Sequence, residues 1–309
     1  MKIIRGLGRL KLYKNTVVAL GVFDGLHLGH RKIIAEAVKK ARHINGTSVV
    51  LTFWPDPHYQ DTLSSFDHKL KLIGSLGVEV CIVLSFNSKI SSLSPSEFIS
   101  RIIIDRLNAS YLYVGRNFKF GKNASGDFNT LIGLAKKMGI NVVGLKVIKA
   151  GGKIISSTYI RRLIRKGLLS QAEKLLLRPV SVHGKVIKGR AIGRNIGFPT
   201  ANISPEHEII PPPGIYAVRV FYGGKEFDGV CYIGKKQSIL KRQSAKDFVE
   251  VHIFGINKDL YNKSLEIEFI KKIREDRKFR NILSLREQIV KDIKTTKAIL
   301  SRHKKYHKI

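Results

Sequence analysis

The sequence predicts a two-domain protein: an N-terminal α/β domain with a parallel sheet, followed by a small all-β barrel that ends in a helix. Three observations lead to this fold class. The chain has 309 residues, about twice the length of a typical domain. Up to about residue 178, short apolar runs alternate with helical patterns, and beyond it short strands alternate with Gly- and Pro-rich turns. We therefore expect domains at 1–178 and 179–309, with the boundary at Arg178-Pro179.

The first half contains apolar runs that predict buried strands. They span residues 17–23, 48–53, 80–84, 111–115 and 141–145. Segments with helical spacing, such as 95–107 and 129–138, lie between them. Strands that alternate with helices are typical of a parallel sheet covered on both faces. Ligands of such sheets bind beyond the carboxyl ends of the strands, so we expect a site where these runs end.

The second half contains shorter strands that Gly and Pro separate. We expect them at 180–186, 215–221, 230–233, 248–254 and 265–269. The run 211–214, PPPG, interrupts the chain after the first of them. This pattern is typical of a small barrel, and a helix over about 283–300 is expected to follow it.

The composition excludes several classes of protein. Hydrophobic residues make up 43% of the chain, which is enough for two cores and argues against a disordered protein. The only two cysteines, Cys81 and Cys231, lie in separate apolar runs, which excludes a disulfide scaffold and a Cys-rich zinc site. The start, MKIIRGLGRLKLYK, lacks the apolar core of a signal peptide, and no apolar run approaches the roughly 20 residues of a membrane span. We expect a cytoplasmic protein with no membrane partner.

The charge of the chain is extreme for a metabolic enzyme. Lys and Arg number 56 against 23 Asp and Glu, a net charge of +33, which favours polyanionic partners. Residues 271–309 hold 14 Lys/Arg against 4 Asp/Glu, so most of the excess is spread over the rest of the chain. The simplest interpretation is a solvated basic surface. The alternative, a nucleic-acid patch, is supported by no RNA-binding signature or zinc-finger pattern, so no specific nucleic-acid partner is expected.

A strand, a turn and a helix meet in the segment 21–30, GVFDGLHLGH. His27 and His30 are three residues apart, so both imidazoles lie on one face of the first helical turn. A helix N-terminus favours phosphate, and glycines let a polyphosphate approach the backbone. Two imidazole donors can then stabilise charge on a phosphoryl group. The alternative is one surface and one core histidine, and a metal site is disfavoured because no third ligand is nearby in sequence.

A second helix start lies in the segment 155–161, ISSTYIR. Ser157 or Thr158 can cap a helix whose apolar face contains Ile160 and Leu163, and Arg161 lies on its first turn. Hydroxyls, free N–H groups and a guanidinium at one helix end predict a second phosphate site. A plain capped amphipathic helix is the alternative.

The second domain carries a further phosphate-binding pattern. Thr200 and Asn202, two apart on an extended segment, point to one side and can hold Mg²⁺ together with phosphate oxygens. The alternative for PTAN at 199–202 is a simple turn. The glycines that punctuate the preceding loop, whose backbone can fold over a polyphosphate, are Gly184, Gly189, Gly193 and Gly197.

Glu250 begins an alternating strand over 250–253 and is expected on its inward face. A carboxylate there is costly unless it has a function. The function that suits it is to accept the proton of a primary hydroxyl as that hydroxyl attacks the γ-phosphate of ATP. A position at the rim of a site is the alternative.

Together these motifs resemble the class of nucleotidyltransferases that carry an H-x-G-H motif and an S-S-T motif followed by an arginine, here Arg161. The segments 52–57 (TFWPDP), 114–121 (VGRNFKFG) and 126–127 (GD) look like the flavin-adenylylating domain of bacterial riboflavin kinase/FAD synthetases. The later segments resemble the riboflavin kinase domain of the same family; they are 193–202 (GRNIGFPTAN), 249–253 (VEVHI), 259–261 (DLY) and 273–279. The resemblance covers nearly the whole chain, in order.

This resemblance implies a Rossmann-like nucleotidyltransferase domain, a riboflavin kinase-like barrel and two activities. Riboflavin would be phosphorylated by ATP to FMN, and FMN would then be adenylylated to FAD with release of pyrophosphate. The implied ligands are riboflavin, FMN, FAD, ATP as co-substrate, pyrophosphate and Mg²⁺. Catalytic roles would fall to Glu250, His27, His30 and Arg161. Nucleotide binding would fall to Gly21, Phe23, Asp24, Gly29, Ser157, Thr158, Gly184, Gly189, Gly197, Thr200 and Asn202, with Mg²⁺ on Thr200 and Asn202. Flavin binding would fall to Pro55, Pro57, Asn117 and Arg274.

Some positions depart from the family pattern. Asp56 stands where His is usual, Asn117 stands where Asp is usual, and the run 232–238 replaces a segment that usually carries Asn, Pro and Thr. Three alternatives therefore accompany the bifunctional prediction. They are an enzyme with one active domain, nucleotidyl transfer to another phosphorylated acceptor, and a nucleic-acid-binding protein that reuses the fold.

Overall fold

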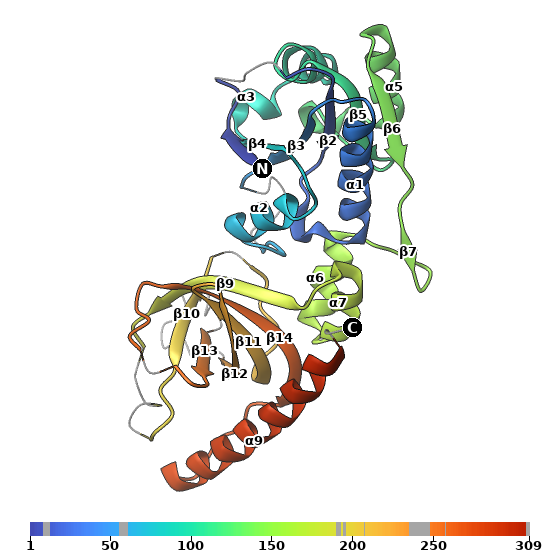
Figure 1. Ribbon diagram of the computed structural model, residues 1–309. Coiled ribbons are helices and arrows are strands. Elements are labelled where there is room, and N and C mark those ends of the chain that lie inside the picture. The colour runs from blue at the N-terminus through green and yellow to red at the C-terminus, as the bar shows by residue number, and fades with distance from the viewer. Residues whose placement is uncertain are drawn as a thin grey trace. The chain divides into compact units, whose positions relative to one another are not determined.

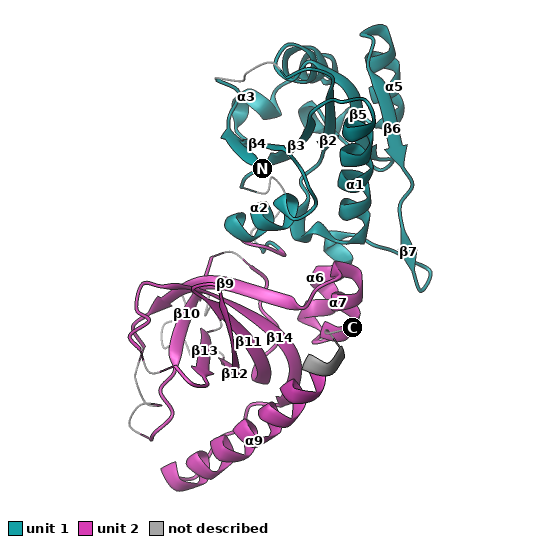
Figure 2. Cartoon of the chain, viewed as in Figure 1, with its two compact units in different colours: residues 1–62, 66–159 teal, residues 63–65, 160–309 magenta. Residues whose placement is uncertain are grey.

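The computed structural model describes residues 1–8, 13–55, 61–189, 193, 196–206, 208–234, 248–256 and 258–306. The chain divides into two compact units (Figure 2). Unit 1 consists of Met1–Thr62 and Phe66–Tyr159, and unit 2 consists of Leu63–Ser65 and Ile160–Ile309. Within the described ranges, no helix is long and apolar enough to cross a membrane.

Unit 1 is built on a six-stranded parallel sheet with the order β1-β4-β3-β2-β5-β6 (Figure 1). The strands are β1 (Lys2–Arg5), β2 (Thr16–Leu20), β3 (Ser48–Phe53), β4 (Val80–Leu84), β5 (Ala109–Gly115) and β6 (Asn141–Leu145). The predicted parallel sheet is confirmed. Strand β1 was not predicted, because KIIR is short and largely exposed and becomes a strand only by pairing with β4.

Helices cover both faces of this sheet, as the sequence predicted. Alternate residues of β2 show this: Val17 and Ala19 pack in one core with α1 (Leu28–His43) and α2 (Phe66–Gly74). Val18 and Leu20 pack in another core with α4 (Pro95–Phe98), a π-helical turn over Ile99–Ile104 and α5 (Phe128–Lys137). Unit 1 also contains α3 (Ser88–Ser91), 3₁₀ turns over Asp24–Leu26 and Lys122–Ala124, and the hairpin of β7 (Lys149–Ala150) and β8 (Lys153–Ile154).

Unit 2 contains a closed antiparallel barrel with the order β10-β13-β12-β11-β14-β9. The strands are β9 (Val180–Ile187), β10 (Ala201–Pro205), β11 (Gly214–Tyr222), β12 (Lys225–Gly234), β13 (Phe248–Ile253) and β14 (Ser264–Arg274). The predicted barrel is confirmed, but β10 was not predicted, because ANISP lacks a run of β-branched residues.

Helices complete unit 2 at both ends of its sequence. Helix α6 (Ser157–Arg165) begins in unit 1 and continues into unit 2, where α7 (Leu169–Leu176) follows it and contacts β9 and β14. The expected final helix is α9 (Ile282–Tyr306), and it packs against β11, β12 and β14 (Figure 1).

Candidate active sites

The H-x-G-H segment lies at the carboxyl edge of the parallel sheet, after the central strand β2. A 3₁₀ turn over Asp24–Leu26 follows the strand, and α1 begins directly after His27. The chain turns sharply here, with Phe23 at φ 53° and Gly25 at φ 73°. Free N–H groups of the α1 N-terminus therefore face the edge where ligands of parallel sheets bind.

Two glycines of this segment make room for neighbouring rings. A Cβ on Gly21 would lie 3.0 Å from the Phe23 ring, and a Cβ on Gly29 would lie 3.2 Å from the His27 ring. The Phe23 ring is buried and meets the His30 ring edge to face, at 5.4 Å between centroids. The two glycines thus leave room for the Phe23 and His27 rings, and the Phe23 ring in turn packs against His30.

The two imidazoles are stacked, with ring centroids 3.6 Å apart. His27 caps α1, because its Nδ1 accepts a hydrogen bond from the backbone N–H of His30 at 3.4 Å. Burial lowers the pKa of His27 from 6.5 to about 4. Burial, followed by the charges of His27 and Lys69, also lowers the pKa of His30 well below 6.5. Both rings are therefore neutral at pH 7, and the proton of His27 is on Nε2.

The carbonyl of Asp24 connects the two motifs predicted to bind phosphate. The Ser157 hydroxyl donates a hydrogen bond to it at 3.1 Å, and the His30 ring also bonds to the Asp24 backbone. The His30 Nδ1 is buried and has no hydrogen-bond partner within the described part of the chain. The segments around residues 27 and 157, far apart in sequence, thus meet at the backbone of Asp24.

Helix α6 differs in one detail from the expectation. Ser156 caps it, since the Ser156 hydroxyl accepts the N–H of Tyr159 at 3.2 Å, so the expected cap at Ser157 or Thr158 is wrong. The helix begins at Ser157, which leaves that hydroxyl for the Asp24 carbonyl. Thr158 is exposed, whereas Arg161 lies in unit 2 and is only 2% exposed.

A cleft of about 410 Å³ lies between the end of β5 and the start of α5 in unit 1. It contains Asn117, and the side chains of Arg116 and Lys119 contribute positive charge to its lining. Asp127 caps α5 by accepting the N–H of Thr130 at 2.9 Å, and this hydrogen bond holds the pKa of its carboxyl below the usual range. The lining thus carries two cations and one carboxylate, and a concave site with this net positive charge suits an anionic ligand.

The other two residues predicted to bind flavin in the first domain follow β3. Pro55 is exposed and joined to Trp54 by a cis peptide bond. Pro57 and the divergent Asp56 lie outside the described residues.

Sequence reasoning missed a buried cation at the same edge of the sheet. Lys69 of α2 is 1% exposed; its Nζ donates to the carbonyl of Phe53 at 3.1 Å and lies 5.7 Å from the Trp54 ring centroid. Its charge is among the causes of the low pKa of His30. The signal that could have found it is its spacing, because Lys69 occupies the apolar face of α2, four residues before the buried Ile73.

In unit 2, strand pairing places three of the predicted kinase residues in one row. Asn202 pairs with Glu250, Glu250 with Tyr232, Tyr232 with Ile215, and Ile215 with Arg274. Directly paired residues of antiparallel strands have side chains on the same face. We call these five residues the outer row, since the neighbouring Val249 and Val251 fill the barrel interior. The expected inward orientation of Glu250 is therefore wrong, because apolar residues occupy the inward positions of β13.

Two glycines approach the predicted magnesium ligands closely. A Cβ on Gly189 would overlap the Asn202 amide, and a Cβ on Gly193 would lie 3.3 Å from the Thr200 hydroxyl and overlap the Phe198 carbonyl. Gly197 has φ 89° with open space around it. Gly184 lies within β9, where a Cβ would overlap the backbone of Ser204 in β10, so its expected place in the loop is wrong.

His252 was also missed from the sequence. Its Nδ1 lies 2.8 Å from the carbonyl of Pro199, and its ring meets Phe198 edge to face at 5.8 Å between centroids. Since Glu250 and His252 alternate along β13, they share the outer face. His252 thereby fixes the start of the PTAN segment beside Glu250.

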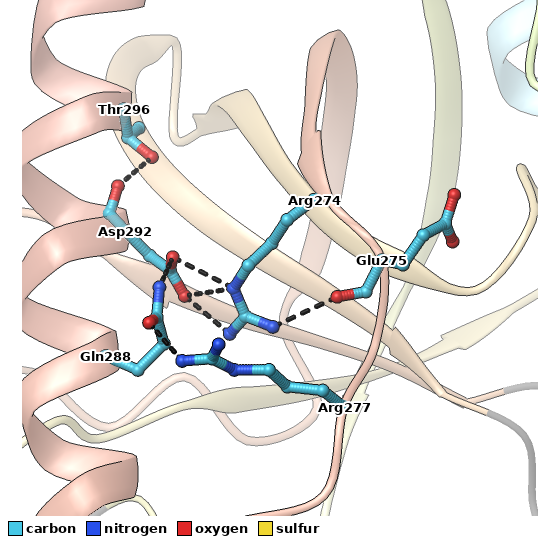
Figure 3. Close-up of polar contacts among 6 residues, drawn as sticks. All are labelled: Arg274, Glu275, Arg277, Gln288, Asp292 and Thr296. Carbon is cyan, nitrogen blue, oxygen red and sulfur yellow. Dashed lines mark hydrogen bonds and ion pairs between the residues drawn. The ribbon is translucent and has the colours of Figure 1, made fainter.

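Arg274 forms a two-point ion pair with Asp292 of α9 (Figure 3). Its Nη2 lies 2.7 Å and its Nε 3.0 Å from the Asp292 carboxylate, and its Nη1 donates to the carbonyl of Glu275 at 3.0 Å. Gln288 donates to Asp292 at 2.7 Å. Asp292 is only 3% exposed, so the pair joins the end of the barrel to the final helix.

Within the described residues, no group of three or more His, Cys, Asp or Glu side chains could hold a metal ion. The oxygens of Thr200 and Asn202 are instead the kind of neutral ligand that Mg²⁺ shares with substrate phosphates.

Comparison with known proteins identifies two families in this chain. The FAD synthetase family matches residues 10–159, and the riboflavin kinase family matches residues 176–300. A crystal structure described as a macrolide-efflux protein from Streptococcus pneumoniae superposes with a TM-score of 0.84 at 28% identity, over 96% of this chain and 99% of that one.

Curated relatives carry both families in one chain. The bifunctional riboflavin kinase/FMN adenylyltransferase of Bacillus subtilis is 38% identical over 287 residues, which cover 90% of each chain. The protein of the same name from Buchnera aphidicola subsp. Schizaphis graminum is 36% identical and covers 96% of this chain and 98% of its own. That of Escherichia coli K12 is 32% identical over 94% of this chain and 96% of its own. The resemblance inferred from the motifs is confirmed, and the chain belongs to the family of bifunctional riboflavin kinase/FMN adenylyltransferases.

Proposed function

We propose that the two reactions of this enzyme occur at separate sites, FMN adenylylation within residues 1–178 and riboflavin phosphorylation within residues 179–309. The protein uses ATP to phosphorylate riboflavin to FMN, and then joins FMN to the AMP part of ATP to give FAD and pyrophosphate. The observation that carries the division is that each unit groups its own predicted site residues. In unit 1, Ser157 and the His30 ring both bond to the backbone of Asp24. In unit 2, strand pairing places Asn202 and Glu250 side by side in the outer row.

In the adenylylation site, the phosphates of ATP would lie at the N-terminus of α1. The Nε2–H of neutral His27 would donate to a phosphate oxygen, whereas His30, Asp24 and Ser157 would hold the turn in place. Gly21, Phe23 and Gly29 would shape the turn. Thr158 would add a hydroxyl from the start of α6. Arg161 is assigned to the same reaction by the family pattern alone.

The chemistry of this step is direct substitution at the α-phosphorus. A phosphate oxygen of FMN forms the new P–O bond, the bond to the β-phosphate oxygen breaks, and pyrophosphate leaves with the electron pair. No protein nucleophile is required, since the FMN phosphate is already one. The enzyme contributes alignment and stabilisation of the charge that develops on pyrophosphate.

The FMN would occupy the cleft after β5. Arg116 and Lys119 would compensate the charge of its phosphate, and Asn117 would contact the flavin. Pro55, which follows β3, is assigned to the flavin by the family pattern. Pro57 is assigned to the same role by the family pattern alone.

In the kinase site, Glu250 would accept the proton of the primary hydroxyl of riboflavin as that oxygen attacks the γ-phosphorus of ATP. The bond from the γ-phosphorus to the bridging oxygen breaks, and ADP leaves with the electron pair. The outer row supports this role, because it places Glu250 directly beside Asn202. Arg274 would act on the flavin through the segment that follows it, because its guanidinium is engaged by Asp292 and Glu275. The loop glycines Gly189 and Gly197 would let the backbone approach the nucleotide, whereas Gly184 allows the close approach of β9 to β10.

Thr200 and Asn202 would hold Mg²⁺ in the kinase site. Their hydroxyl and amide oxygens suit this ion, and the close approach of Gly189 and Gly193 keeps both side chains in place. When bound, Mg²⁺ would neutralise charge on the ATP phosphates. Because both reactions consume ATP, we also propose that the enzyme acts in the cytoplasm.

The division into two sites is tested with Glu250→Gln, which keeps the size of the side chain but removes the base. FMN formation from riboflavin and Mg-ATP should fall by about 10²–10⁴-fold. FAD formation from supplied FMN should continue at the unmodified rate. Both are measured as initial rates by chromatographic separation of the flavins, with the exposed Glu287→Gln of α9 as control. An equal loss of both activities would contradict the division.

A further inference from the structure

Tyr232 occupies a specific place in the outer row, between Glu250 on β13 and Ile215 on β11. Asn202 lies on the opposite side of Glu250. In phosphoryl transfer, the attacking and leaving oxygens lie roughly in line on opposite sides of the phosphoryl group. If Asn202 marks the side of the ATP phosphates, Tyr232 lies on the side of the acceptor hydroxyl.

The hydroxyl of Tyr232 has a definite partner. It donates a hydrogen bond to the carboxylate of Asp276 at 2.9 Å. Burial, the bond to Asp276 and the nearby charges of Asp276 and Glu250 raise the pKa of Tyr232 to about 12. The hydroxyl therefore keeps its proton and remains a donor over the whole neutral range. The ring is held edge to face against Phe248, at 5.4 Å between centroids.

Asp276 belongs to the segment 275–277, which is fixed on its other side to α9. Arg274, directly before it, is paired with Asp292, and Arg277 donates to Gln288 (Figure 3). Tyr232 thus attaches the segment to the barrel, whereas the arginines attach it to the helix. The side chains of Glu275, Asp276 and Arg277 are themselves exposed, so the segment has little burial of its own to fix it.

We propose that Tyr232 is a positioning residue for the flavin substrate of the kinase reaction. Through Asp276 it holds the segment 275–277 at the acceptor side of Glu250, so that the primary hydroxyl of riboflavin binds within reach of the base. The inference rests on the proposed role of Glu250. It also gives a function to a position where this chain departs from the family pattern.

The test compares four variants in the full-length enzyme. Tyr232→Phe and Asp276→Ala each remove the hydrogen bond, Asp276→Asn keeps an acceptor oxygen, and Tyr222→Phe at the far end of β11 is the control. The first two should raise the KM for riboflavin about three- to tenfold, the contribution of one partly exposed hydrogen bond. The KM for ATP and the melting temperature should change little. Asp276→Asn should restore most of the riboflavin affinity.

The double variant Tyr232→Phe/Asp276→Ala completes the cycle. Its KM for riboflavin should be no higher than that of either single variant, because each single substitution already removes the same hydrogen bond. If the effects of the two single substitutions on the KM for riboflavin added up in the double variant, the proposal would be overturned. Equal increases in the KM values for riboflavin and ATP would show a general structural role and would overturn it too. An unchanged riboflavin KM in Tyr232→Phe would overturn it as well.

A binding measurement separates this inference from the proposed role of Glu250. Riboflavin affinity is measured from flavin fluorescence in the presence of a non-hydrolysable ATP analogue, where no proton transfer occurs. Tyr232→Phe should weaken binding by the same three- to tenfold. Glu250→Gln should bind riboflavin normally and fail only in turnover. If Glu250→Gln turned over normally, the proposed base would be wrong, whereas the binding result would still decide the role of Tyr232.

Discussion

Single side chains at the H-x-G-H turn show how burial sets the role of a histidine. His27 uses Nδ1 to cap α1 and keeps a proton on Nε2, whereas the ring of His30 bonds to the Asp24 backbone. In the proposed adenylylation site, His27 is therefore the ring that would donate to a phosphate oxygen, and His30 would support the turn. Sequence spacing could place both rings on one face but could not distinguish these two roles.

Replacement of His27 should accordingly damage adenylylation. We expect His27→Ala to lower FAD formation from FMN by about 10²–10³-fold, as for a lost oxyanion donor, and to leave FMN formation intact. Because the pKa of His27 is about 4, its protonation should not limit the rate between pH 6 and 8. Initial rates over that pH range check both statements, with the exposed His43→Ala as control. If the rate of FAD formation by the unmodified enzyme fell as the pH was lowered, with a midpoint near pH 6.5, the neutral state of the His27 ring would be contradicted.

Among the elements, α9 depends on one buried ion pair for its attachment to β14. Arg274 bonds to Asp292 through two nitrogens, and Asp292 also accepts from Gln288. Asp292→Ala leaves the partly buried guanidinium without its partner and should destabilise the protein by about 2–4 kcal/mol. Urea unfolding monitored by circular dichroism measures this, with the exposed Glu287→Ala on the same helix as control. Equal stability of the two variants would contradict this account of the helix.

The short segment Leu63–Ser65 is attached to the barrel through a buried carboxyl. Glu208 accepts the backbone N–H groups of Ser65 at 2.9 Å and His183 at 3.1 Å. Burial, with smaller contributions from Glu206 and Glu266, raises its pKa from 4.5 to about 8 against the opposing effect of these hydrogen bonds. At pH 7 the carboxyl is therefore mostly protonated.

This carboxyl makes stability depend on pH. A raised carboxyl pKa means that the folded protein binds the proton more tightly, so this contribution to stability is present at low pH and is lost as the pH rises from 4.5 to 8. Glu208→Gln retains an acceptor oxygen and does not ionise. The unfolding free energy of Glu208→Gln minus that of the unmodified enzyme should therefore increase between pH 5 and pH 8, by on the order of 2–4 kcal/mol. Urea unfolding at several pH values checks this, and a pH-independent difference would contradict it.

The elements also show where sequence reasoning succeeded and where it failed. Apolar runs such as Val80–Leu84 predicted strands, because they are buried on both faces whatever their neighbours are. Strand β10 was not predicted from the sequence, since its pairing with β9 and β13 arises only when the barrel closes. The outer row depends on the same long-range register, so Glu250 and Asn202 could be named from motifs, but their adjacency could not. Tyr232 was visible only as a departure from the family pattern.

For the whole molecule, the charge of +33 is consistent with its ligands. ATP, FMN, FAD and pyrophosphate are all anions, and riboflavin alone is not. A positive field over a protein surface raises the rate at which anionic ligands arrive. Because salt screens such fields over about 10 Å at 0.1 M, the benefit is greatest in dilute buffer.

Two separate sites in one chain also predict that damaged molecules can complement each other. His27→Ala should still make FMN, and Glu250→Gln should still convert FMN to FAD. A mixture of the two variants, supplied with riboflavin and Mg-ATP, should therefore produce FAD, whereas the first alone should accumulate FMN and the second alone should make little of either product. The rate in the mixture should increase with total protein concentration until the FMN released by one molecule saturates the other. Chromatography of the flavins over time measures this. A mixture that accumulated FMN without FAD would show that the Glu250→Gln molecules do not adenylylate released FMN, and the assignment of Glu250 to the kinase reaction alone would then be wrong.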